Sequence, residues 1–463
     1  FKQKTAYEIY QCDWSSDVCS SDLASYNSNG SNNVAIGSQA LYTNTSTTCA
    51  VAIGRQAGYT LSNGDTDIGG STFVGVQSGY SASTATDSTF IGANAGKFTS
   101  SGSKNTAVGS QALQYNTTAN YNTAVGYKAA YSNVTGTELV AVGYRALEAS
   151  TGTGNTGVGY AAAYNTTSGS SNTAIGDNAL SSNTTASSNV ALGYQAGYNN
   201  VGSNNTYLGT YAGYNSRGTS NTYVGQSSGS QTGSAASCTG SYNVGVGDTA
   251  LQTLSSGNYN TALGYQAGYT NSTGSENTFL GYQAGYTSNA ATNGRNTFVG
   301  MQAGYSVTTG TDNTFLGRYS GQAMTTGNNN TIVGRFTGNQ GGLDIRTSSN
   351  YIVLSDGDGN PRQVIDSSGN VGIGVTPSYK LDVVGAANNT PQFRLNTGSN
   401  NTSDATYTGE GGLFASYQRQ NGATYNRNLD ITSNGDSTWG GIIRFSTNPN
   451  SSATSVEIGR AHV

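Results

Sequence analysis

Hydrophobic and polar positions follow one short pattern that recurs from about Asn33 to Thr337. The consensus of the copies is N-T-[A/F/Y]-[V/I/L]-G-x-x-A-[G/L]-Y, and a turn rich in Ser, Thr, Asn and Gly follows it. The glycine after the aliphatic residue is named here the anchor glycine. The eighteen anchor glycines are Gly37, Gly54, Gly75, Gly92, Gly109, Gly126, Gly143, Gly159, Gly176, Gly193, Gly209, Gly225, Gly247, Gly264, Gly281, Gly300, Gly317 and Gly334. Most are 17 residues apart, and such a period predicts a solenoid in which each repeat forms one coil.

Two repeat positions are restricted in size. The residue before the anchor glycine is always Val, Ile or Leu, and the third residue after it is always small. A large residue facing a small one suits a narrow interior, so we expect the aliphatic column, meaning that position in successive coils, to be buried. Thr or Val two positions earlier then shares this inner face. The residue between them, for example Phe279 or Phe298, would point outward, and an outward Phe column predicts burial against another chain or a second layer.

Polar and special residues support a continuous sheet. Asn begins the expected strand in fourteen coils, where it could adopt a left-handed turn conformation or form a hydrogen-bonded ladder with the Asn of the next coil. The anchor glycine predicts a positive φ or a close backbone approach. All four prolines (Pro361, Pro377, Pro391 and Pro449) follow the repeats, which fits because proline cannot donate to a sheet ladder.

Composition sets the scale of the core. The 463 residues are 34% hydrophobic and 9% charged, against about 45–50% and 25% in ordinary globular domains. That supply suits a thin core repeated in every coil better than one large core. The prediction is an all-β chain, a parallel β-solenoid or β-roll of about eighteen coils over residues 24–340. The net charge of −4 argues against nucleic-acid binding.

A different pattern follows the repeats. Residues 341–390 are expected to form a β-hairpin and connector, with the hairpin over Tyr351–Asp366 and its turn at DGDGN. This turn lacks the terminal Glu of a calcium loop, so we expect no metal site. Residues 391–457 are expected to form a small β domain from the segments FRLN, LFASYQRQ, RNLDI and GIIRFST.

Several segments resemble known fibre proteins. NVAIGSQAL (Asn33 to Leu41) and NTAIGDNAL (Asn172 to Leu180) are similar to head repeats of trimeric autotransporter adhesins, and NTFLGYQAGYTSNAATNGRNTFVG resembles repeats of phage tail fibres. SSGNVGIGVTPSYKLDVVG (Ser367 to Gly385) resembles the segment before the distal region of such fibres. The resemblance implies a homotrimer located in a virion tail or at a cell surface.

The two ends differ from the rest. FKQKTAYEI and CDWSSDVCSSDL within residues 1–23, and the last residues 458–463, resemble a translated sequencing adapter and its reverse complement. We therefore expect the natural protein to extend beyond both ends. Cys12, Cys19, Trp14 and the single histidine, His462, lie in these segments and are excluded from functional reasoning.

No arrangement typical of catalysis is found in the remaining sequence, so we expect no enzymatic activity, no cofactor, no metal and no membrane insertion. The leading hypothesis is a structural fibre shaft that presents a distal host-binding region. The alternative is that the repeats themselves bind host-surface glycans, because tyrosines recur five residues after the anchor. The candidate residues are Tyr198, Tyr214, Tyr269, Tyr286 and Tyr305. Ice binding by the Thr column is weaker, because Thr would share its face with a buried aliphatic residue.

Overall fold

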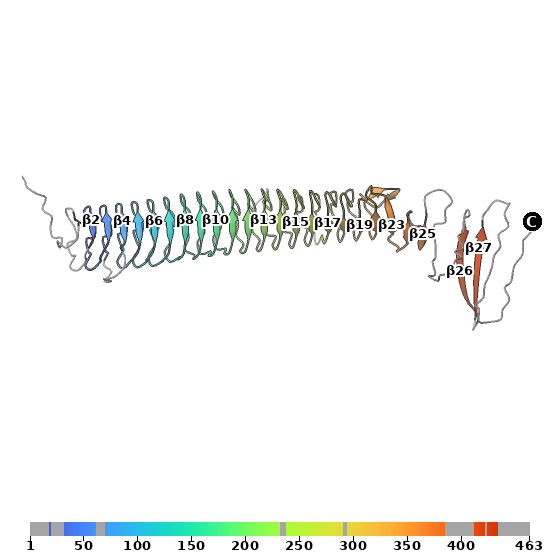
Figure 1. Ribbon diagram of the computed structural model, residues 1–463, viewed down its shortest axis with the longest axis horizontal. Helices are drawn as coiled ribbons and strands as arrows, with labels where there is room; N and C mark the ends of the chain where they lie inside the picture. The colour runs from blue at the N-terminus through green and yellow to red at the C-terminus, as the bar shows by residue number, and fades with distance from the viewer. Residues whose placement is uncertain are drawn as a thin grey trace, which may run out of the picture.

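The computed structural model describes residues 32–61, 70–231, 238–289 and 294–384, together with three strands whose flanking residues it does not describe: β1 (Val18–Cys19), β26 (Gly412–Asn421) and β27 (Thr424–Ser433). Every regular element among these residues is a β-strand. Figure 1 shows the repeats as a long stack of coils that carry one strand each. The predicted all-β parallel solenoid of about eighteen coils is confirmed.

Eighteen strands of three residues form the solenoid, one in each coil. They are β2 (Val34–Ile36), β3 (Val51–Ile53), β4 (Thr72–Val74), β5 (Thr89–Ile91), β6 (Thr106–Val108), β7 (Thr123–Val125), β8 (Val140–Val142), β9 (Thr156–Val158), β10 (Thr173–Ile175), β11 (Val190–Leu192), β12 (Thr206–Leu208), β13 (Thr222–Val224), β14 (Val244–Val246), β15 (Thr261–Leu263), β16 (Thr278–Leu280), β17 (Thr297–Val299), β18 (Thr314–Leu316) and β19 (Thr331–Val333).

Each strand pairs in parallel with the strand of the next coil, and equivalent residues are in register. Between β16 and β17, for example, Thr278 pairs with Thr297, and Phe279 with Phe298. The turns are joined in the same way, since the Leu113 N–H donates to the Ala129 carbonyl at 3.0 Å. Backbone hydrogen bonds therefore link successive coils at the turns as well as at the strand.

The predicted orientation of the strand is wrong. The middle residue is buried in every coil, whereas the residue before the anchor glycine points outward: Phe279 is fully buried and Leu263 is 47% exposed. The Thr or Val column does share a face with the aliphatic column, as predicted, but this face is the outer one. The small column three residues after the anchor is inside. The error came from pairing that small column with the aliphatic residue instead of with the middle residue.

The interior is filled by two positions of complementary size, the middle strand residue and the residue six positions later. Where the middle residue is Phe or Tyr, the later residue is always Gly, as in Phe73 with Gly79. A Cβ at Gly79 would lie 2.6 Å from Phe73 Cδ1. Where the later residue is Leu, as in Leu113, the middle residue is Ala or Gly, here Ala107, and both are buried. In these coils the two positions fill the interior at close packing. A coil with Ala and Gly at the two positions, such as Ala52 with Gly58, is filled by Phe73 and Leu41 of its neighbours.

The anchor glycines adopt the predicted positive φ and also approach the next coil closely. Gly281 has φ of 136°, and a Cβ there would lie 2.6 Å from the carbonyl oxygen of Gly300. An L-residue at this position would meet both a disfavoured backbone conformation and another backbone. The sequence therefore keeps glycine wherever one coil turns over the next.

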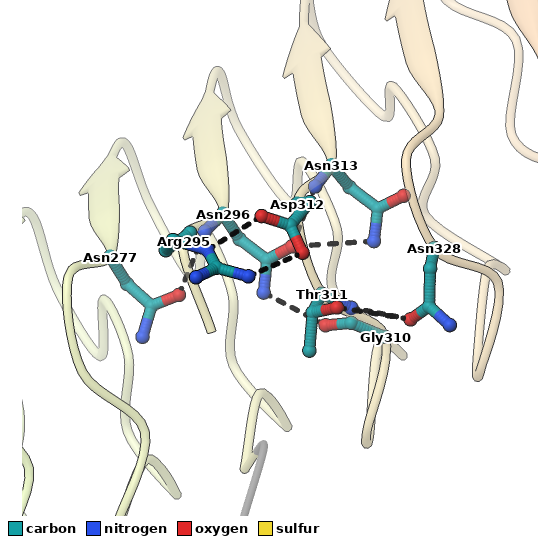
Figure 2. Close-up of polar contacts among 8 residues, drawn as sticks. All are labelled: Asn277, Arg295, Asn296, Gly310, Thr311, Asp312, Asn313 and Asn328. Atoms are coloured by element: carbon teal, nitrogen blue, oxygen red, sulfur yellow. Dashed lines mark hydrogen bonds and ion pairs between the residues drawn. The ribbon is translucent and has the colours of Figure 1, made fainter. Parts of the chain in front are cut away.

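The Asn that precedes the strand in fourteen coils forms a ladder. Figure 2 shows this for Asn277, Asn296 and Asn313: the Asn296 N–H donates to Asn277 Oδ1 at 3.0 Å, and the Asn313 N–H to Asn296 Oδ1 at 3.0 Å. The Asn296 amide Nδ2 donates to the Gly310 carbonyl at 2.9 Å. Of the two predicted roles, the ladder is confirmed and the left-handed conformation is wrong. That conformation belongs to the preceding residue, for example Arg295 with φ of 44°.

The solenoid ends in a short antiparallel region. Strand β22 (Ile352–Ser355) stacks in parallel on β19 and then pairs antiparallel with β23 (Pro361–Ile365), which confirms the predicted hairpin. Strand β23 pairs with β24 (Val371–Ile373), which is followed by β25 (Leu381–Val383). Strands β20 (Asn339–Gln340) and β21 (Leu343–Asp344) form a separate small pair.

The remaining predictions concern segments near the two ends. LFASYQRQ and RNLDI lie in β26 and β27, which form one antiparallel hairpin. FRLN and GIIRFST lie outside the described residues. So do the adapter-like ends, except that β1 pairs in parallel with β2. The adapter origin of residues 1–23 and 458–463 stays a prediction.

Candidate binding surfaces

The five candidate tyrosines lie in two stacked groups at one edge of the turn. Tyr198 and Tyr214 have ring centroids 5.3 Å apart and are nearly parallel. Tyr269, Tyr286 and Tyr305 form a run with centroids 5.0 Å apart at each step and interplanar angles of 4° and 6°. The structure thus brings the predicted residues together as an aromatic ladder.

This stacking limits how these rings could bind a sugar. Both faces of Tyr286 are covered, one by Tyr269 and the other by Tyr305. A sugar that stacks on an aromatic ring needs an open face, so only the terminal rings of each run could offer one. Burial and the neighbouring tyrosines also raise the pKa of Tyr286. The geometry therefore favours a structural role for the middle of the ladder.

More exposed tyrosines lie elsewhere. Tyr160 and Tyr282, which directly follow an anchor glycine, are 54% and 46% exposed. Tyr242 and Tyr259, five residues before an anchor glycine, are 52% and 59% exposed, and their rings stack at 5.1 Å. This last group was not among the predicted residues, although its constant distance from the anchor glycine was a signal that could have revealed it.

The outward side of β2–β19 forms a second candidate surface, which we name the strand face. It consists of the Thr or Val column, from Val34 to Thr331, and the aliphatic column, from Ile36 to Val333. None of these residues is charged, and many are about 40% exposed, including Val190 and Leu192. In the hypothesis of ice binding, Thr was expected to adjoin a buried aliphatic residue. That expectation is wrong, because the adjoining aliphatic residue is exposed. The face still pairs Thr with bulky aliphatic residues instead of with a second Thr.

A charged group lies beside the strand face. The Arg295 guanidinium contacts the Asp312 carboxylate of the next coil through Nε–Oδ1 at 2.6 Å and Nη2–Oδ2 at 3.0 Å, as Figure 2 shows. These hydrogen bonds hold the pKa of Asp312 below its usual value. The side chains of Arg295 and Asp312 are 50% and 31% exposed, so the ion pair between the two coils adds little stability.

The DGDGN turn is held by its own backbone. The Asp356 carboxylate accepts hydrogen bonds from the N–H groups of Asp358 and Asn360, at 3.0 and 2.9 Å, and from Arg362 Nε at 2.9 Å. These donors, the Asn360 N–H first among them, hold the pKa of Asp356 well below its usual range. The predicted turn is confirmed, and its carboxylate oxygens are engaged within the loop.

Other chemistry gives no further candidate. In the described part of the chain, no three or more His, Cys, Asp or Glu side chains are grouped as metal ligands would be. The same residues include no helix long and apolar enough to cross a membrane. Comparisons with protein-family models, curated proteins and solved structures found no match.

Proposed function

We propose that this chain is the shaft of a fibre, of the kind found in phage tail fibres or surface adhesins, which holds a distal host-binding region. The observation that carries the proposal is the uninterrupted pairing of β2 through β19. Seventeen steps at about 4.8 Å each give a rod of about 80 Å. A rod of this kind separates what lies at its two ends.

The chemistry of the rod fits a mechanical role. Each coil contacts mainly its neighbours, so the length is set by the number of repeats and a coil can be added or lost without changing the fold. The Asn and tyrosine ladders connect equivalent residues along the rod. The homotrimer, the virion or cell-surface location and the lack of enzymatic activity belong to the same proposal, and they rest on the sequence resemblance and its motifs.

Electron microscopy of the purified chain tests the shaft. The repeats should appear as a straight rod of about 80 Å. Deletion of residues 106–139 removes two complete coils, because it joins Asn105 to Val140 at equivalent repeat positions. The rod should shorten by about 10 Å and stay folded. A compact particle, or a deletion that unfolds the remaining coils, would contradict the proposal.

Glycan binding by the repeats remains a second candidate, favoured by the exposed rings of Tyr242 and Tyr259. A glycan array would test it with the Tyr259→Ala and Tyr286→Ala variants. Ring stacking on a sugar predicts that Tyr259→Ala lowers binding strongly and Tyr286→Ala only weakly, because both faces of Tyr286 are covered. Absence of any bound glycan with the intact rod would reject this candidate and leave the shaft unaffected.

A further inference from the structure

We propose that copies of this chain pack against one another through the strand face, parallel and with equivalent coils at the same level. The partner is a second copy of this chain. The inference rests on the exposure of the Thr or Val column and the aliphatic column, and on the residues beside them. It goes beyond the proposed shaft because it names the surface through which copies of the shaft meet. It also replaces the Phe column, which is buried inside each coil, as the surface expected to meet another chain.

The strand face, which is uncharged and made of Thr, Val, Ile and Leu, is as large as the largest apolar patches of typical monomers. Eighteen strands at about 4.8 Å spacing, each exposing two residues about 7 Å apart, give a flat area on the order of 600 Å². The largest apolar patch of a typical monomer is about 300–600 Å². With the exposed tyrosines on both sides, such as Tyr259 and Tyr265, the area comes close to the roughly 800 Å² that each partner buries in a stable interface.

The period of the face matches a second copy best. Its two columns repeat at the strand spacing over all eighteen coils, and equivalent residues pair in register from β2 to β19. Another solenoid of the same sequence presents the same period, the same length and the same absence of charge. In the parallel arrangement the Thr or Val column of one copy then faces the aliphatic column of the other at every level, which gives complementary packing along the whole rod.

The residues beside the face decide between parallel and antiparallel packing. One edge consists of the residues five before each anchor glycine and the other of those directly after it. In parallel packing the first edge of one copy meets the second edge of its partner at the same level. Asp312 then faces Arg318, and Tyr259 faces Tyr265. No coil carries like charges at its two edges, so no level brings like charges together.

Antiparallel packing with full overlap gives a different result. Each edge then meets the same edge of the partner in reverse order. Asp87 would face Glu276, and Arg55 would face Arg318, and each pair would occur twice, so four levels would bring like charges together. All four of these side chains are on the surface. Like charges at an interface disfavour an arrangement, so the edges select the parallel, unstaggered one.

Sedimentation velocity of two variants in one coil tests the contact surface. Leu263→Glu places a charge on the strand face, and Ser256→Glu places the same charge on an exposed turn of the same coil. The wild-type chain should associate, Leu263→Glu should weaken association at least tenfold, and Ser256→Glu should match wild type. Circular dichroism should show that all three are folded. A monomeric wild type, or equal association of the two variants, overturns the proposal.

Disulfide trapping tests the orientation. With Cys12, Cys19, Cys49 and Cys238 changed to Ser, the pair Asp312→Cys and Arg318→Cys should form a disulfide between copies. A second variant keeps Cys49 and carries only Asp312→Cys, because antiparallel packing would place these two residues opposite each other. Cross-linking of the second variant alone overturns the parallel arrangement. A rod of full length that stays monomeric would reject the contact and leave the shaft proposal standing.

Discussion

Two groups of coils differ in what fills them although their backbones are alike. The coils of β16, β17 and β18 contain Phe279, Phe298 and Phe315, whose rings stack along the rod at 5.6 and 4.9 Å. The coils of β6, β8 and β10 contain Ala at the same position and Leu six residues later. Strand length and pairing are the same in both groups. One backbone therefore accepts two side-chain solutions.

The difference shows that the interior is specified by pairs of positions and not by single columns. Gly304 has φ of 61°, and a Cβ there would lie 2.5 Å from Phe298 Cδ2. Leu113 adopts a similar φ of 50° in its alanine-filled coil. The backbone at this turn thus accepts either residue, and the size of the strand residue decides which one fits.

The largest expected loss of stability comes from removing the aromatic ring inside a coil. Phe90→Ala removes a fully buried ring whose neighbour Gly96 cannot fill the space. The loss should be about 3–5 kcal/mol. Amide hydrogen exchange of peptides around β5 should show it locally, because a long repeat array does not unfold as one unit. Exchange in distant coils, such as that of β15, serves as the control and should stay unchanged.

Adding a second large side chain to the interior of an aromatic coil should cause the next largest loss of stability. In Gly96→Leu, the new side chain overlaps the Phe90 ring, and overpacking of this kind costs about 1–3 kcal/mol. The backbone is not the cause, because Gly96 has φ of 55° and Leu113 has 50°. Hydrogen exchange should rise around β5. A folded coil with unchanged exchange would contradict the conclusion that the size of the middle strand residue decides which residue fits six positions later.

The Asn ladder should contribute equally in the two groups of coils. Asn105→Ala, beside an alanine-filled coil, removes the acceptor of the Asn122 N–H and the donor to the Ala119 carbonyl. Asn313→Ala, beside a phenylalanine-filled coil, removes the equivalent bonds to Asn330 and Gly327. Each should cost about 1–3 kcal/mol, since buried backbone groups lose their partners. A clear difference between the two costs would show that the ladder and the core are coupled.

The smallest effect should come from the surface ion pair. Asp312→Asn breaks the contact with Arg295 and should cost at most about 1 kcal/mol, because both groups are at least partly exposed to solvent. The folded pKa of Asp312 is lowered, so the stabilisation is present above the unfolded value of about 3.9 and is lost as pH falls below it. Hydrogen exchange should distinguish the variant from wild type at neutral pH. The two should converge as pH falls through the lowered pKa of Asp312 in the folded chain.

The sequence predicted the solenoid, its period, the glycine turns and the terminal hairpin, because each depends on local spacing. It did not predict which face of the strand is buried, because three-residue strands alternate only once and both faces carry apolar residues. The Phe73–Gly79 and Ala107–Leu113 pairs held the missing information. The buried face follows from the sequence only if the middle strand residue and the residue six positions later are compared together across the coils.

The candidate site was predicted less completely than the fold. The fifth-position tyrosines were correctly placed together, but stacked rings such as Tyr269 and Tyr286 cover each other's faces. The repeat spacing predicts which tyrosines are adjacent in a column. It does not predict the orientation of their rings, which decides whether a ring face is exposed. The more exposed Tyr259 was missed because its position, although at a constant distance from the anchor glycine, carries different residue types in different coils.

The paired variant Phe90→Ala with Gly96→Leu tests the complementary interior most directly. It converts an aromatic coil into the alanine and leucine pair of Ala107 and Leu113. Local hydrogen exchange should show the double variant to be more stable than either single variant, with an interaction energy of about 2–3 kcal/mol. Additive losses from the two changes would contradict the account, because they would show that the two positions fill the coil independently.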